Sequence, residues 1–346
     1  MSAAPSITTF RDDVRAAIRD AGAPRHVIVL AIDGVPYALA ARAWPRAQVA
    51  ERRSVFPTTS ATAWLSSLTG ASVDAHGVPG VVFAVEPGAT PIDVYQYQGS
   101  LGAPPPTDLF SDAAGAGYAP VAILGDLEDT PGAWRDLLVH RARPVHGHRF
   151  FWEPGAGGAP GAIAARVGAA VDAALAAQPG PCLAWCFVDA DHHIHRAGYD
   201  APLIEFLAQL DALAAAWAAR GALVIAHSDH GLAPTRHDPS IAAAIERAAA
   251  DHGGALGGAG RTRWLDVAPD REAAARAALR AALPASVAIR HADELFAPGS
   301  RARARVGAIV LIARGEAFVA PAGYAYEHGS LTEAELAVPL AVWSPC

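Results

Sequence analysis

The stretch HVIVLAIDG (26–34) decides the fold class, because an unbroken apolar run leads directly into an aspartate and a glycine. Runs of this length are typical of strands that are covered on both faces of a sheet. Comparable runs are APVAIL (119–124), CLAWCFV (182–188), ALVIAHS (222–228), GAIVLIA (307–313) and PLAVW (339–343). Helical patterns lie between several of them, at 108–117, 161–178 and 201–221. This alternation predicts an α/β fold with a mostly parallel central sheet and helices on both faces.

Two regions interrupt the alternation. Residues 80–118 are rich in Pro, Gly and aromatic side chains and are interpreted as a loop or lid. Residues 235–304 contain a compact β–α–β pattern and are interpreted as a small inserted α+β cap. We therefore predict a catalytic core formed by 1–234 and 305–346, interrupted by a cap subdomain at 235–304.

Composition limits the function classes. The 346 residues are 52% hydrophobic and 18% charged, which argues against disorder. The net charge of −7 argues against general nucleic-acid binding, which needs a basic surface. The sequence lacks a signal-peptide pattern and a long uncharged apolar run, and its cysteines (Cys182, Cys186 and Cys346) do not suggest a disulfide framework. We expect a cytoplasmic enzyme without a membrane partner; the oligomeric state stays open.

Aspartate and histidine residues recur where the predicted strands end. Asp33 follows the first run, the sequence DADHHIH (189–195) follows the third, and Asp229 with His230 follows the fourth. His328 precedes the last run. Ligands of open α/β sheets bind beyond the carboxyl ends of the strands, so these side chains are expected to meet at one edge. Each motif alone could be a turn or a helix cap, but together they indicate a metal site with His nitrogen and carboxylate oxygen ligands.

The chain resembles the alkaline phosphatase superfamily, and within it the type I phosphodiesterase/nucleotide pyrophosphatase branch. The resemblance rests on six motifs in order along most of the chain: AIDGVP, FPTTSATAWLSSLTG, DAHGVPG, DADHHIH, HSDHGL and EHGSLTEAELAVPL. It implies two divalent metal ions, usually zinc with manganese as an alternative. By motif, one metal takes Asp191, His195 and His328. The other takes Asp33, Asp229, His230 and the oxygen of the nucleophile.

The resemblance also implies a covalent nucleophile, which the motif places at Ser60. A simpler role for Ser60 is to begin the helix predicted for the following residues. The two roles are compatible, because a helix N-terminus offers backbone N–H groups to a phosphate. Thr59, one position earlier, stays as the rival nucleophile. Asp189, His192 and His193 flank the ligands and are expected either to line the pocket or to lie on the surface.

The chain departs from the family pattern in three ways. The nucleophile is Ser where this branch usually has Thr. The segment HGVPGVVF (76–83) lacks the Asn that donates to a phosphate oxygen in nucleotide pyrophosphatases. No Asp precedes Ser60 as in the alkaline phosphatases proper, and no sulfatase modification motif is present. These departures leave the substrate class open.

The resemblance implies a phosphodiesterase or nucleotide pyrophosphatase that acts through a phospho-serine intermediate on a small anionic phosphate ester. The alternatives are a phosphomonoesterase, phosphonate hydrolase or phosphotransferase at the same site, and a non-catalytic binding protein with this fold. Aromatic residues in VYQYQG (94–99) and RFFWEPG (149–155) could stack on a substrate ring or could serve packing.

Overall fold

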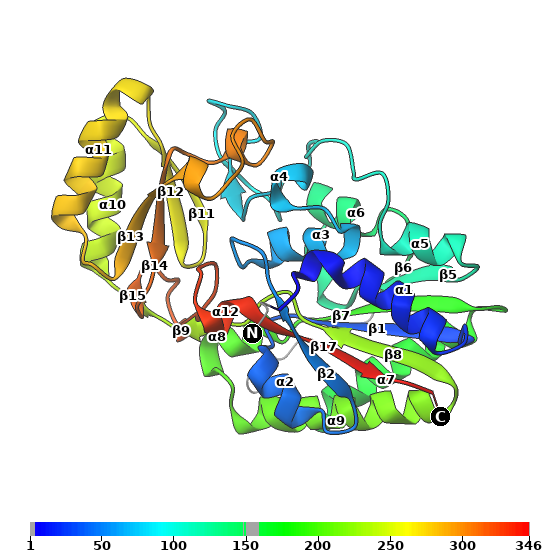
Figure 1. Ribbon diagram of the computed structural model, residues 1–346. Helices are drawn as coiled ribbons and strands as arrows, with labels where there is room; N and C mark the ends of the chain where they lie inside the picture. Colours follow the sequence, from blue (N-terminus) through cyan, green and yellow to red (C-terminus); the bar gives the residue numbers. More distant parts are fainter. Residues whose placement is uncertain (1–3, 148, 150–158, 346) are drawn as a thin grey trace.

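The computed structural model describes residues 4–147, 149 and 159–345, so most of the segment 149–155 lies outside the described residues. A seven-stranded sheet forms the centre of the core (Figure 1). Its strand order is β2 (Gln48–Arg53), β17 (Ala337–Trp343), β8 (Ala222–His227), β1 (His26–Ile32), β7 (Cys182–Val188), β5 (Ala119–Ile123) and β6 (Arg143–Val145). The pairs from β8 to β6 are parallel, whereas β17 runs antiparallel to both of its neighbours.

Helices cover both faces of this sheet, as the sequence predicts (Figure 1). Alternate residues of β1 enter two cores: Val27 and Val29 face one, and Ile28 and Leu30 face the other. The first face carries α1 (Phe10–Asp20), α3 (Ser60–Thr69), α4 (Val73–His76), α5 (Leu109–Gly115) and α6 (Ala133–Val139). The second carries α2 (Tyr37–Ala43), α7 (Pro160–Ala176) and α9 (Ala201–Ala219). Short helices α8 (Asp191–Ala197) and α12 (Glu333–Leu336) lie near the strand ends where the metal ligands were predicted.

One described helix, α9, is long and apolar enough to cross a membrane by length and composition alone. It packs against α7 and β8, and its buried side chains, Phe206 and Leu210 among them, belong to the second core. Its apolar character is therefore explained by its place in the core.

A second sheet forms the cap, which lies beside the core in Figure 1. Its order is β13 (Val287–His291), β14 (Ile309–Ala313), β12 (Thr262–Asp266), β11 (Ala255–Ala259), β3 (Val82–Phe83) and β4 (Ile92–Asp93). Helices α10 (Pro239–His252) and α11 (Pro269–Ala282) cover one face through a third core. Two short ladders lie between cap and core segments of the chain. One pairs β9 (Ala233–Pro234) with β16 (Tyr326–Glu327), and the other pairs β10 (Arg236–His237) with β15 (Ala317–Phe318).

The cap sheet extends beyond the predicted range 235–304. Strand β14, which the sequence analysis assigned to the core, pairs with β12 and β13. Strands β3 and β4, from the predicted lid, extend the same sheet. An apolar run such as Ile309–Ala313 fits the interior of either sheet, so the run alone does not specify its partners. That 235–304 forms a separate domain stays a prediction.

Candidate metal centre and active site

Six predicted ligand residues form two adjacent groups in the structure. Asp191, His195 and His328 offer ligand atoms that all lie within 4.8 Å of one another, and the same holds for Asp33, Asp229 and His230. The rings of His230 and His328 stack with centroids 3.9 Å apart, so the two groups of residues are in direct contact. The expected grouping by motif agrees with this geometry.

The chain positions these side chains by ending its strands at one edge. Asp33 follows β1, Asp191 begins α8 shortly after β7, and Asp229 and His230 follow β8. Strands β7, β1 and β8 are neighbours in parallel register, which brings their carboxyl ends together. His328 follows β16, whose pairing with β9 holds it over this edge. The order of the strands therefore brings together ligand residues that are far apart in the sequence.

The ligand atoms are closely spaced. His195 Nε2 lies 2.9 Å and His328 Nε2 lies 3.9 Å from the same Asp191 oxygen. In the other group, His230 Nε2 lies 3.2 Å from Asp229 Oδ2 and 3.6 Å from Asp33 Oδ1. Two buried carboxylate oxygens, Asp191 Oδ1 and Asp229 Oδ2, accept no hydrogen bond from any described residue. Clustered nitrogen and oxygen donors with unsatisfied carboxylate oxygens are what a divalent cation requires, so the residues fit a metal pair.

Neighbouring groups orient the ligands. His195 Nδ1 contacts the carbonyl oxygen of Tyr326 at 2.9 Å, and His328 Nδ1 contacts that of Thr58 at 2.8 Å. Donation from each Nδ1–H leaves Nε2 free to bind a cation. Trp64 Nε1 donates to Asp33 at 3.0 Å, and the Gly34 amide donates to Asp229 at 3.4 Å. These contacts fix which atoms face the centre.

Burial without a bound cation disturbs the ionisation of this cluster. Burial, reinforced by Asp229, raises the pKa of Asp33 well above its usual range. Burial, followed by the charge of His230, lowers the pKa of His328. Burial and Asp191 raise the pKa of Asp189 to about 7. Burial lowers the pKa of His195, but Asp191 outweighs it and raises that pKa to about 9. The cluster thus carries mutually repelling carboxylates that positive charge would relieve.

Ser60 is the first residue of α3 and faces the second group. Its Oγ lies 3.3 Å from Asp33 Oδ1 and 3.2 Å from His230 Nε2. Thr59 precedes the helix, is fully buried, and lines neither of the two cavities that Ser60 lines. The geometry therefore favours Ser60 over Thr59 as the residue that a substrate could reach.

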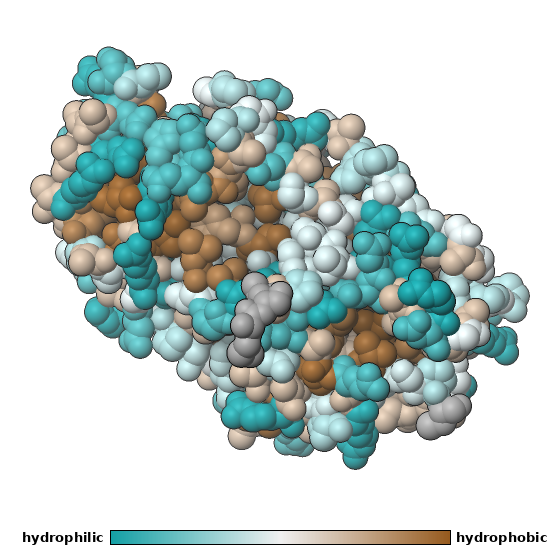
Figure 2. Space-filling model, viewed as in Figure 1, coloured by the Kyte–Doolittle hydropathy of each residue, from teal (hydrophilic) through white to brown (hydrophobic). Residues whose placement is uncertain are grey.

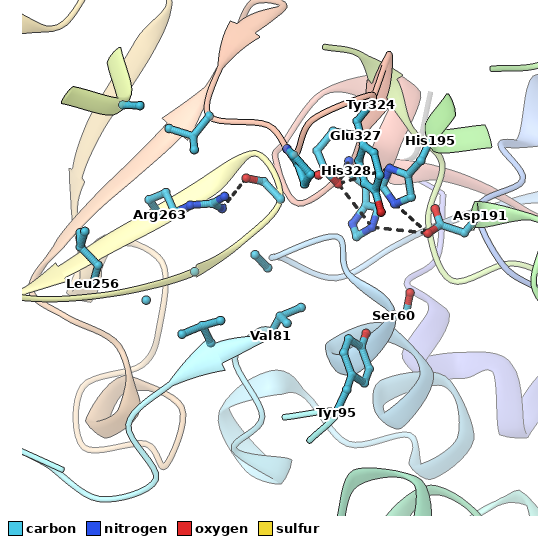
Figure 3. A pocket seen from close by; sticks show the side chains of 18 of the residues that line it. Ser60, Val81, Tyr95, Asp191, His195, Leu256, Arg263, Tyr324, Glu327 and His328 are labelled. Carbon is cyan, nitrogen blue, oxygen red and sulfur yellow. Dashed lines mark hydrogen bonds and ion pairs between the residues drawn. The ribbon is translucent and has the colours of Figure 1, made fainter. Parts of the chain in front are cut away.

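Two cavities meet at Ser60. A cleft of about 580 Å³ runs from Ser60 and His328 to the cap (Figure 3), where Figure 2 shows hydrophobic atoms gathered between cap and core. A smaller cavity of about 200 Å³ runs from Ser60 toward Trp134 and Asp126. Both are lined by Ser60, Tyr95, Asp189 and Asp191. A group bound at Ser60 would have space on two sides.

The flanking residues differ in their placement. Asp189 lines both cavities and accepts a hydrogen bond from the His192 amide. His192 lines the larger cleft. His193 is buried elsewhere, with Nε2 2.9 Å from Asp200 at the start of α9, so it joins two helices instead of facing the cleft. Within the DADHHIH motif, Asp189 and His192 therefore line the site, whereas His193 has a structural role.

Sequence reasoning left two site residues unassigned. Tyr95, from VYQYQG, lines both cavities and points its hydroxyl toward Ser60 (Figure 3). Arg263, on β12, lines the cap side of the cleft (Figure 3). The aromatic cluster had drawn attention to Tyr95, but nothing in the sequence near Arg263 distinguished it from other arginines.

Comparison with solved structures identifies the fold. Murine ectonucleotide pyrophosphatase/phosphodiesterase 5 superposes with a TM-score of 0.64 at 17% identity, covering 91% of this chain and 87% of that one. Phosphonoacetate hydrolase from Sinorhizobium meliloti, in complex with phosphonoformate, superposes with a TM-score of 0.65 at 19% identity, covering 93% and 91%. An inactive variant of the murine protein was solved in complex with AMP. No protein-family model matches this chain, and comparison with curated sequences finds no match.

Proposed function

We propose that this chain, which has the fold of the nucleotide pyrophosphatase/phosphodiesterase branch of the alkaline phosphatase superfamily, is a metal-dependent phosphodiesterase. The observation that carries the proposal is the position of Ser60. Its Oγ lies within hydrogen-bond distance of Asp33 and His230, beside two groups of metal-ligand residues, where two cavities meet.

The two cavities favour a diester. A phosphodiester carries two organic groups, and each could occupy one cavity while phosphorus faces Ser60. A phosphomonoester would leave one cavity unused. The alternative activities, on a phosphomonoester or a phosphonate or in phosphoryl transfer, use the same residues and stay open to the test below.

Asp191, His195 and His328 would hold one divalent ion, and Asp33, Asp229, His230 and Ser60 the other. Bound zinc or manganese would polarise the phosphoryl group and lower the pKa of the Ser60 hydroxyl. The histidine tautomers set by Tyr326 and Thr58 keep Nε2 available for this role.

The reaction proposed for Ser60 has two steps. First, Oγ attacks phosphorus and its proton passes to solvent. The bond from phosphorus to the leaving oxygen breaks, and this oxygen takes up a proton from solvent and departs as an alcohol. Then water attacks phosphorus of the phospho-serine, the bond to Oγ breaks, and Oγ regains a proton. The net change is hydrolysis of a diester to a monoester and an alcohol.

Tyr95 is proposed to supply the donor that the missing Asn supplies in relatives. Its hydroxyl is already directed at Ser60, and its ring stacks edge-on against Trp134 with centroids 5.1 Å apart. Trp134 Nε1 donates to the Ala61 carbonyl at 2.9 Å, which ties this pair of rings to the start of α3. Burial, together with Asp33 and Asp229, raises the pKa of Tyr95, so the phenol stays protonated and able to donate.

The test compares hydrolysis of bis-p-nitrophenyl phosphate and p-nitrophenyl phosphate with zinc or manganese, for the wild type, Ser60→Ala and Thr59→Val. We expect the wild type to prefer the diester, and Ser60→Ala to lose about 10³-fold or more in kcat. Thr59→Val, which keeps a similar volume in the buried position, should retain activity. Preference for the monoester would indicate a phosphatase, and an active Ser60→Ala variant would refute the nucleophile.

A further inference from the structure

Three arginines among the described residues, Arg261, Arg263 and Arg305, lie near the join between cap and core, and they differ in how their guanidinium groups are bonded. Arg305 uses all its nitrogens, with Nε, Nη1 and Nη2 donating to the carbonyls of Val85, Gly77 and Leu101. These hydrogen bonds join segments of the backbone and leave Arg305 no free donor nitrogen.

Arg261 is also committed to its surroundings. It donates to two backbone carbonyls and lies 3.5 Å from the carboxylate of Glu335. It is 1% exposed, and its charge is balanced by that carboxylate.

Arg263 differs from both. Its Nη1 donates to the carbonyls of Gly260 and Thr262, in the turn between β11 and β12. Among the described residues, Nε and Nη2 have no hydrogen-bond partner, and no carboxylate lies within 4 Å of the guanidinium. Because Nη1 is fixed to the turn, the free edge of the guanidinium is the Nε–Nη2 side. That edge offers two parallel N–H groups, the arrangement that binds a carboxylate or phosphate in bidentate fashion.

The hairpin is shaped to place this side chain. Gly258 pairs with Arg263 across the two strands. A Cβ on Gly258 would come 3.1 Å from Arg263 Cδ and 2.3 Å from the Thr262 carbonyl oxygen. Because Gly258 has no side chain, the aliphatic part of Arg263 has space to lie over the turn.

The surroundings of Arg263 are apolar on the cap side. Val81, Leu256, Ile245 and Val319 line that end of the cleft. Burial lowers the pKa of Arg263, whereas the charge of Glu327 raises it. Glu327 is itself engaged, 3.7 Å from His195 and 3.6 Å from His328, and Glu246 lies exposed on the α10 side of the cleft. A half-buried cation in apolar surroundings, with no carboxylate within ion-pair distance, attracts an anion.

We propose that Arg263 binds a second anionic group of the substrate, a carboxylate or a phosphate, at the cap side of the cleft. The substrate class is then a phosphate ester whose organic part carries a further negative charge. This inference rests on the proposed function for the identity of the first phosphate, which faces Ser60. It gives the cap a direct part in substrate recognition.

Binding can be measured without turnover. Isothermal titration calorimetry of the metal-loaded protein would compare phosphonoacetate, phosphonopropionate and phosphonobutyrate with analogues in which the carboxylate is replaced by a neutral amide. Each pair differs only in the distal charge. We expect the wild type to prefer at least one carboxylate by about 10- to 100-fold over its amide, the range of a charge-assisted hydrogen bond. Propylenediphosphonate against propylphosphonate tests a distal phosphate in the same way.

Arg263→Gln should abolish this preference and leave the affinity for the amides unchanged, which also shows that the site is folded. Arg263→Lys should restore only part of it, because lysine keeps the charge but lacks the bidentate edge. Arg290→Gln is the matched control, since Arg290 is exposed on cap strand β13 and pairs with Glu294 at 3.2 Å.

Two outcomes would overturn the proposal: no preference for any distal anion in the wild type, or equal loss of carboxylate and amide binding in Arg263→Gln. Hydrolysis of the nitrophenyl esters is measured on the same preparations. Ester hydrolysis without anion preference refutes only the role of Arg263. Anion preference without ester hydrolysis supports Arg263 and refutes the proposed reaction.

Discussion

Ser60 and Thr59 are neighbours in the chain, yet only Ser60 faces the cleft. The reason is the start of α3: Thr59 has extended backbone and a buried side chain, and Ser60 is the first helical residue. The motif places the nucleophile at Ser60 with Thr59 as the rival, but which hydroxyl a substrate can reach depends on the direction in which each side chain leaves the backbone.

Tyr95 carries the prediction that belongs to a single hydroxyl. In Tyr95→Phe, kcat should fall by about 10²- to 10³-fold, the usual effect of removing one donor to a developing oxyanion. KM and bound metal should change little, because the ring and its packing on Trp134 remain. Steady-state kinetics on the better nitrophenyl ester, with metal content by elemental analysis, checks this.

Tyr97→Phe is the control for that variant, since Tyr97 is half-buried against the same core but does not line either cavity at Ser60. It should keep nearly full kcat. If Tyr95→Phe lowers the melting temperature but leaves kcat within about threefold of wild type, Tyr95 has a packing role only.

At the scale of elements, the β11–β12 hairpin links the cap to the metal ligands. Gly260 has φ +46°, and a Cβ there would come 2.0 Å from the carbonyl oxygen of His328. The Arg261 amide donates to that same carbonyl at 2.6 Å. The hairpin turn thus buttresses the segment that carries His328.

Gly260→Ala should therefore weaken metal binding as well as stability. We expect zinc affinity to fall by about 10-fold or more, the usual cost of disturbing a group that positions a ligand. Competition with a chromophoric chelator measures the affinity, and thermal unfolding measures the stability.

Gly253→Ala provides the matched control, because Gly253 also has positive φ (+63°) but a Cβ there meets nothing within 4 Å. It should cost about 1–2 kcal/mol of left-handed strain and leave zinc affinity unchanged. Equal zinc affinity in both variants would contradict the buttressing role of the hairpin.

At the scale of the whole molecule, the metal pair is expected to govern stability as a function of pH. Two groups fix the sign in the metal-free protein. The pKa of His195 is raised to about 9, so its contribution is complete below its unfolded value of 6.5 and is lost as pH rises toward 9. The pKa of Asp189 is raised from 3.8 to about 7, so folding favours its protonated form and stability falls as pH rises through this range.

The chelated protein should therefore lose melting temperature between pH 6.5 and 9, and the gain on adding zinc should grow over the same range. Differential scanning calorimetry with and without chelator tests this. His328 acts in the opposite sense below pH 6.5, where its lowered pKa makes protonation destabilising, so the measurement is confined to the higher range. A flat or rising melting temperature in the chelated protein would contradict the expectation.

The order of the sheet could be only partly predicted. The parallel strands β1, β7 and β8 were identified from their apolar runs, but β2 was not, because the edge strand QVAERR is mostly polar and half-exposed. Strand β14 was recognised as a strand and assigned to the wrong sheet, since an apolar run carries no information about its partners. The cytoplasmic location stays a prediction from the sequence, and the oligomeric state stays open.

The sequence by itself determined the α/β architecture, because strand periodicity is written in short stretches of chain. It also placed Asp33, Asp191, Asp229 and His230 after predicted strands. The division into Asp191, His195 and His328 on one side and Asp33, Asp229 and His230 on the other is what the family resemblance implies. The tertiary structure alone decided that Ser60 and not Thr59 faces the cleft, that Tyr95 stands beside it, and that Arg263 keeps two free donors. These depend on which distant segments meet, and the hydrogen bonds that a side chain has left over are known only when all its neighbours are in place.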